Sequence, residues 1–161
     1  MRLIEQLVKV LAKILFNKQA GNYSAALDSI NNGLNALVGL DYKMVDELGV
    51  NEIISLLDYA NEKSIVNIKS IIAGKLIKEK SDILKLNKTE DSKLIPNYQK
   101  ALSLILEGIL NNKNPEIDLS NYHQDVREIT SVLGNGITPE TKLKLFEFYE
   151  LPAEYKKEKE G

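Results

Sequence analysis

The sequence predicts an all-α protein, and three observations carry this prediction. Apolar residues recur at three- and four-residue steps through most of the 161-residue chain, which is the period of a helix with one buried face. No segment sustains the two-residue alternation that is typical of a strand. Residues that favour helix starts and ends, such as Thr138-Pro139 and Gly39, separate the periodic segments. We therefore expect seven or eight helices in antiparallel pairs, because their connections are short.

The first half of the chain predicts two regular helices and a less regular stretch. The helix over residues 2 to 18 has an apolar stripe made of Leu3, Leu7, Leu11, Ile14 and Leu15. A second helix follows over 23 to 38 and should pack antiparallel to the first. Two shorter helices are expected over 42 to 48 and over 51 to 59, the second with Asn51 as its N-cap.

The second half of the chain predicts four more helices, over residues 64–86, 94–112, 119–133 and 139–150. The first of them is apolar at Ile65, Ile68, Ile72, Leu76, Ile83 and Leu86, with lysines on its other face. Because proline is tolerated in a first turn, the second should begin close to Pro96. We expect a single domain over 1–151, since 161 residues suit one core, and a flexible polar tail over 152–161.

Composition excludes several classes of protein. An apolar share of 43% with 27% charged residues is ordinary for a globular chain. The absence of cysteine excludes disulfides, thiolate metal sites and cysteine nucleophiles. Charged residues interrupt every apolar run well before about 20 residues, so we expect no membrane attachment and a cytoplasmic protein. Residues 63–113 hold 10 basic and 5 acidic residues, but the basic ones are all lysine, which favours a solvated helix face over nucleic-acid binding.

One motif occurs twice. Residues 23–33 and 98–108 both read Y-x-x-A-L-x-x-I-x-x-G. With Gly21 ahead of the first copy, this helix pair resembles the tetratricopeptide repeat, a helix–turn–helix unit of about 34 residues. The resemblance implies a right-handed array of antiparallel pairs. The second copy fits the repeat in two registers, and we favour the one in which its helix begins close to Pro96.

Two further stretches, R-L-I-E-Q-L-V-K-V-L-A-K-I-L at the start and T-P-E-T-K-L-K-L-F near the end, resemble a small family of uncharacterised bacterial proteins built on such helices. That resemblance implies a fold and no activity.

Candidate chemistry is sparse. The single histidine, His123, has Asp118, Asp125 and Glu128 near it in sequence. Asp118 precedes the helix and Asp125 points to another face, so a metal or acid–base site is not expected. We expect His123 to be solvent-exposed. The sequence therefore predicts no enzyme, no cofactor and no bound metal.

The sequence instead favours a non-catalytic scaffold or adaptor that binds a protein partner. In tetratricopeptide proteins the groove lined by first helices binds peptides, and here it would present Lys75, Lys78 and Lys85 to an acidic segment. The alternative function is a small-molecule or lipid binder with an enclosed apolar cavity between helix pairs.

The last helix is apolar on more sides than one buried face requires, at Leu143, Leu145, Phe146, Phe148, Tyr149 and Leu151. Either it packs beneath the helix over 119–133 while the tail covers the rest, or it is an unfinished repeat completed by another chain. The second reading predicts a homodimer or a partner contact through Phe146, Phe148 and Tyr149.

Overall fold

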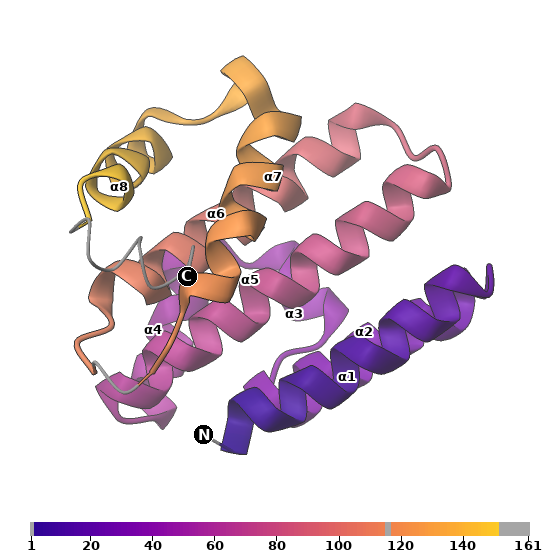
Figure 1. Cartoon of the computed structure of the whole chain (residues 1–161), viewed down its shortest axis with the longest axis horizontal. Helices are drawn as coiled ribbons and strands as arrows, with labels where there is room; N and C mark the ends of the chain where they lie inside the picture. Colours follow the sequence, from indigo (N-terminus) through magenta and orange to yellow (C-terminus); the bar gives the residue numbers. More distant parts are fainter. Residues whose placement is uncertain (1, 115–116, 152–161) are drawn as a thin grey trace.

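The structure is a computed structural model that describes residues 2–114 and 117–151 (Figure 1). All regular structure in these residues is helical, which confirms the predicted fold class. Eight α-helices lie in the described residues: α1 (Arg2–Gln19), α2 (Tyr23–Gly33), α3 (Tyr42–Glu47), α4 (Val50–Ala60), α5 (Lys63–Leu86), α6 (Asp91–Asn111), α7 (His123–Leu133) and α8 (Pro139–Tyr149). The predicted tail over 152–161 lies outside the described residues.

Three short turns extend these helices. A π-helical turn, Leu34–Val38, continues α2, a 3-10 turn, Ser120–Tyr122, leads into α7, and a second one, Gly134–Gly136, follows it. As predicted, Gly39 ends the second helix in the left-handed conformation, with φ of 86°.

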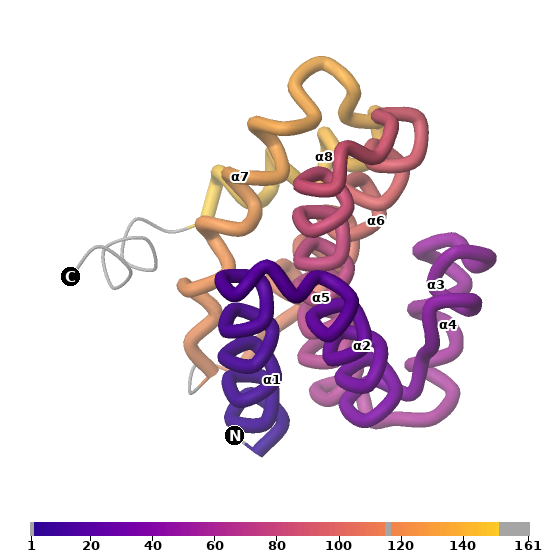
Figure 2. The backbone as a smooth tube through the Cα atoms, turned by 90° about the vertical axis from the view of Figure 1, so that its right-hand side faces the viewer, coloured from indigo at the N-terminus to yellow at the C-terminus, as the bar shows by residue number. Residues whose placement is uncertain are grey.

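The helices α5 and α6 form a long antiparallel pair at the centre of the molecule (Figure 1). The pair α1–α2 packs along one side of α5. The helices α3 and α4 lie on another side of α5, apart from the pair α1–α2 (Figure 2). The helices α7 and α8 both pack on α6. The array of helix pairs is therefore as expected, whereas a tetratricopeptide-like superhelical arrangement of these pairs stays a prediction.

Two glycines bring α5 and α6 into backbone contact. A Cβ atom added at Gly74 would lie 2.7 Å from the carbonyl oxygen of Ala101, and one added at Gly108 would lie 2.5 Å from that of Asn67. Real Cβ atoms do not approach other atoms so closely, so these two sites require glycine. The close approach buries the facing residues of both helices, and α5 and α6 supply much of the core.

The two copies of the repeated motif pack in the same way but lie at different positions along their helices. Its alanine and isoleucine are fully buried in both copies, and its glycine faces a preceding helix in both. Gly33 faces Val10 of α1, and Gly108 faces Ile71 of α5. However, Tyr23 is the first residue of α2, whereas Tyr98 lies well inside α6.

The start of α6 corrects the favoured register of the second copy. The helix begins at Asp91, so Pro96 lies inside it and beyond its first turn. Leu94 is buried and anchors the added turn in the core. Proline has no N–H, so the carbonyl four residues before Pro96 receives no helical hydrogen bond. Pro96 is exposed, and this carbonyl therefore lies on the solvent side of the helix. Packing of Leu94 thus overrides the local preference of proline.

Three smaller expectations are also corrected. Gly49, not Asn51, is the N-cap of α4, and its N–H donates to Glu52 Oε1 at 3.1 Å. Leu15 is half exposed, because α1 packs on α2 and α5 through the face that carries Leu7 and Ile14. Leu86 is exposed at the last position of α5, where the chain turns toward α6.

Candidate interaction surface

Helix α8 begins where the sequence predicts. Thr138 is its N-cap, with the threonine Oγ1 accepting a hydrogen bond from Thr141 N at 3.4 Å, and Pro139 occupies the first helical position. Lys144 ties the helix to α6, since its Nζ lies 3.1 Å from Glu107 Oε2 and donates to Ser103 Oγ at 2.9 Å. α8 is therefore held in place by both a cap and a charged contact.

One face of α8 is buried. Thr141, Leu145 and Phe148 point inward, and Phe148 is only 3% exposed. Its ring meets the ring of His123 edge to face, with centroids 4.8 Å apart. Phe148 therefore does not belong to an open partner surface, which corrects the prediction.

The same contact corrects the expectation for His123, which is 2% exposed rather than solvent-facing. The 3-10 turn before α7 and the packing of α7 and α8 on α6 bring this first-turn residue into the interior. Sequence spacing does not reveal the contact, because the two rings lie 25 positions apart on different helices.

The opposite face of α8 is an apolar stripe of three side chains that are more than half exposed: Leu143, Phe146 and Tyr149. We call it the α8 stripe. Phe146, at its centre, is 70% exposed. The exposed residues Lys142 and Glu150 stand at its two ends. Phe146 and Tyr149 thus lie on the surface as predicted, and Leu143 joins them.

Two of the three lysines predicted to line a peptide groove, Lys78 and Lys75, lie in an ionic cluster instead. Lys78 is 4% exposed, and its Nζ lies 2.7 Å from Glu128 Oε2, 3.1 Å from Asp82 Oδ2 and 3.5 Å from Asp125 Oδ1. Tyr98 donates from its hydroxyl to Asp82 at 2.6 Å. Carboxylates from α5 and α7 therefore enclose this cation.

Lys75 belongs to the same cluster. Its Nζ lies 2.7 Å from Asp125 Oδ1 and 3.2 Å from Glu79 Oε1, and Glu79 in turn is 3.6 Å from Lys18 Nζ on α1. Lys85 is exposed on the last turn of α5. The three lysines do not share one open face, so the prediction of a basic groove built from them is corrected.

The pKa shifts in this cluster follow its geometry. Burial alone would lower the pKa of Lys78, but its hydrogen bonds to Glu128 and Asp82 outweigh burial and raise it. The hydrogen bond from Lys78 lowers the pKa of Glu128. Burial and the bond to Asp82 raise the pKa of Tyr98. The shifts at Lys78 and Glu128 keep both groups ionised and paired around neutral pH.

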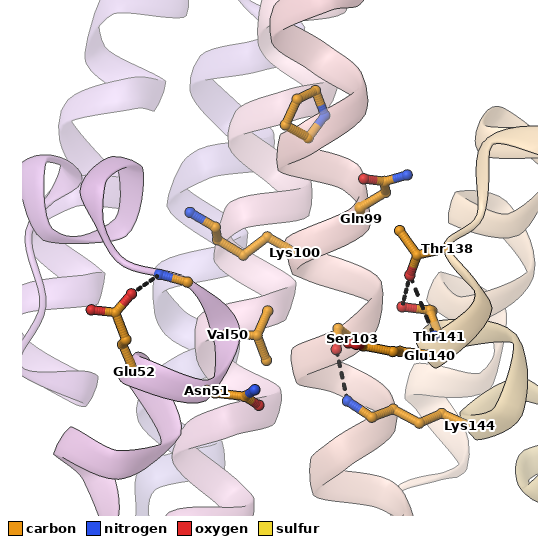
Figure 3. Close-up of a pocket in the computed structure, with 12 residues that line it drawn as sticks. Val50, Asn51, Glu52, Gln99, Lys100, Ser103, Thr138, Glu140, Thr141 and Lys144 are labelled. Atoms are coloured by element: carbon orange, nitrogen blue, oxygen red, sulfur yellow. Dashed lines mark hydrogen bonds between the residues drawn. The ribbon is translucent and has the colours of Figure 1, made fainter.

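A cleft of about 400 Å³ opens between the start of α4, the middle of α6 and the start of α8 (Figure 3). Most of the side chains that line it are polar, among them Gln99, Lys100, Ser103, Thr138 and Glu140. The enclosed apolar cavity expected of a lipid binder differs from this cleft in both lining and shape.

Three charged groups of the cleft, Lys100, Glu52 and Lys144, have partners within the protein. Lys100 donates to the carbonyl of Val45, and burial lowers the pKa of Lys100. Glu52 accepts from the backbone of Gly49, and Lys144 is held by α6 as described above (Figure 3). The cleft thus has the character of a solvated junction between three helices.

Apolar side chains are also exposed outside α8. Leu15 of α1 is half exposed, and α5, α6 and α7 expose Leu86, Ile95 and Val132. Two helices expose a further pair each: Val8 and Phe16 on α1, and Leu56 and Tyr59 on α4. Neither pair was predicted as a surface, because the stripe assigned to α1 used Leu15 as a buried residue and the stretch of α4 was read as irregular. The exposed charges near Phe16 on α1 include two lysines, Lys9 and Lys13.

Comparison of the chain with family models, curated proteins and solved structures finds no match. Within residues 2–114 and 117–151, no helix has the length and apolar character needed to cross a membrane. The same residues hold no group of three or more histidine, aspartate or glutamate side chains placed to bind a metal ion.

Proposed function

We propose that this protein is a non-catalytic interaction module that docks a protein partner on the α8 stripe. The observation that carries the proposal is that Leu143, Phe146 and Tyr149 all lie on one exposed side of a helix whose other side is buried. Aromatic residues gathered on an exposed surface are typical of protein contacts.

The anchoring of α8 supports the same function. Phe148 packs against His123, and Lys144 contacts both Glu107 and Ser103 of α6. The stripe is therefore presented by a rigid helix, which lowers the entropy cost of binding. The resemblance to tetratricopeptide repeats also favours an interaction role.

Site-specific photo-crosslinking in cells that produce the protein tests this proposal. We replace Phe146 with benzoylphenylalanine in the full chain and expect one discrete cross-linked product. Tyr59 provides a matched control, because it is an aromatic residue on α4 that is 94% exposed and samples random collisions. Adding Leu143→Glu to the Phe146 probe should abolish the product, since it places a charge in the stripe.

A product at position 146 that is missing at position 59 and is lost with Leu143→Glu supports docking on the stripe. Equal labelling at positions 146 and 59, or a product that survives Leu143→Glu, excludes it. Unfolding curves of the Leu143→Glu chain should match the wild type, because Leu143 is exposed.

A further inference from the structure

The geometry points to a second copy of this chain as the occupant of the α8 stripe, with the two α8 helices antiparallel and centred on Phe146. This inference rests on the proposed function and names the partner of the same surface. The argument comes from the order of residues along the exposed side of α8.

The α8 stripe is symmetric in spacing about Phe146. Leu143 and Tyr149 lie three residues before and after it, and Lys142 and Glu150 lie four residues before and after it. At 3.6 residues per turn all four positions fall within about 60° of Phe146 around the helix. Glu150 keeps the helical path, because its N–H donates to the carbonyl of Phe146 at 3.1 Å.

A two-fold axis at Phe146 that relates two antiparallel copies of α8 brings these residues of the two copies opposite one another. In an antiparallel pair each position before the centre faces the equivalent position after it in the other copy. Phe146 then meets Phe146, Leu143 meets Tyr149, and Lys142 meets Glu150, each of the last two contacts occurring twice. All five side chains are exposed.

The charges select the antiparallel arrangement. A parallel pair in register sets Lys142 against Lys142 and Glu150 against Glu150, which places like charges together. The antiparallel pair makes two opposite-charge contacts at the edges of an apolar centre, the arrangement of a small protein interface.

The size of the stripe predicts a weak complex. Three side chains per copy bury less than the about 1,200 Å² typical of stable interfaces. We therefore expect a dissociation constant on the order of 0.1 mM, with monomer and dimer exchanging rapidly.

Sedimentation equilibrium of the purified full chain over a wide concentration range tests the pairing. Lys142→Glu and Glu150→Lys should each weaken self-association about tenfold, since each variant makes two like-charge contacts with itself. An equimolar mixture of the two variants should recover wild-type association, because both edges of the mixed dimer then join opposite charges. Lys85→Glu changes the net charge in the same way as Lys142→Glu but at an exposed site on α5, and it should leave association unchanged.

A wild type that stays monomeric at about 1 mM, or a mixture no stronger than the single variants, overturns the antiparallel pair. If the probe at position 146 still yields a product of another mass in cells, the docking function stands and only the identity of the partner is wrong. If both experiments fail, the proposed function falls as well.

Discussion

The central pair α5–α6 and the terminal helix α8 show that similar apolar sequence patterns can be buried in one helix and exposed in another. Both regions carry apolar residues on more than one side. Helices α1, α2, α4 and α6 all contact α5, so its apolar faces are covered. Among the described residues, helix α8 packs mainly on α6 and contacts α7 through His123, and its second apolar side, the α8 stripe, stays exposed.

The charged residues of the two regions differ in the same way. Lys78 of α5 is buried and paired with carboxylates of its own helix and of α7. Lys142 of α8 is exposed. Lys78 therefore stabilises the fold, because carboxylates surround it. Lys142 can contact a partner, because its side of α8 is exposed.

The largest effect is expected from removing the buried cation of the central region. Lys78→Met leaves Asp82, Asp125 and Glu128 gathered without their shared partner, and we expect a loss of about 4 kcal/mol in the free energy of unfolding. Urea denaturation followed by circular dichroism measures it. The exposed control Lys85→Met should change the same quantity by less than about 0.5 kcal/mol. Equal losses would show that the cluster is not structural.

The two sides of α8 give the next largest contrast. Phe148→Ala removes a buried ring from its contact with His123, so we expect a loss of about 3 kcal/mol. Phe146→Ala removes an exposed ring of the same helix and should cost less than about 0.5 kcal/mol in the monomer. Thermal unfolding at low protein concentration, where self-association is negligible, compares the two. Similar melting temperatures for the two variants would contradict the assignment of buried and open sides.

The smallest effect concerns the contact between α5 and α6. Gly108→Ala forces a Cβ against Asn67 O, and we expect a net loss of about 2 kcal/mol after the better helix propensity of alanine is included. Gly136→Ala is the matched control, because a Cβ there meets nothing within 4 Å. Urea midpoints report both changes. A Gly108→Ala protein as stable as Gly136→Ala would mean that the two helices are not in backbone contact.

Sequence reasoning succeeded where a local signal was strong. Thr138 and Pro139 marked the start of α8, Gly39 marked the end of the second helix, and the helical period marked α5. It failed at Pro96, where the buried Leu94 extends the helix upstream of its expected start. It also failed at His123, whose neighbour Phe148 is remote in sequence.

The candidate site was predicted only in part, because its local features are visible in the sequence and its long-range contacts are not. The apolar excess of α8 is visible in the chain, so Phe146 and Tyr149 were identified. Which aromatic residue faces inward depends on where α6 and α7 lie, and Phe148 was therefore assigned to the surface. Lys75 and Lys78 were placed on an open groove because their partner Asp125 is about 50 residues away in the sequence.

The amino-acid order by itself determined the helical class, most helix boundaries and the surplus of apolar side chains near the C-terminus, because these follow from local periodicity and capping. The tertiary structure decided which of those side chains and lysines are covered, because burial depends on neighbours that are distant along the chain. Within the described residues, the α8 stripe is the apolar side of the last helix that stays more than half exposed.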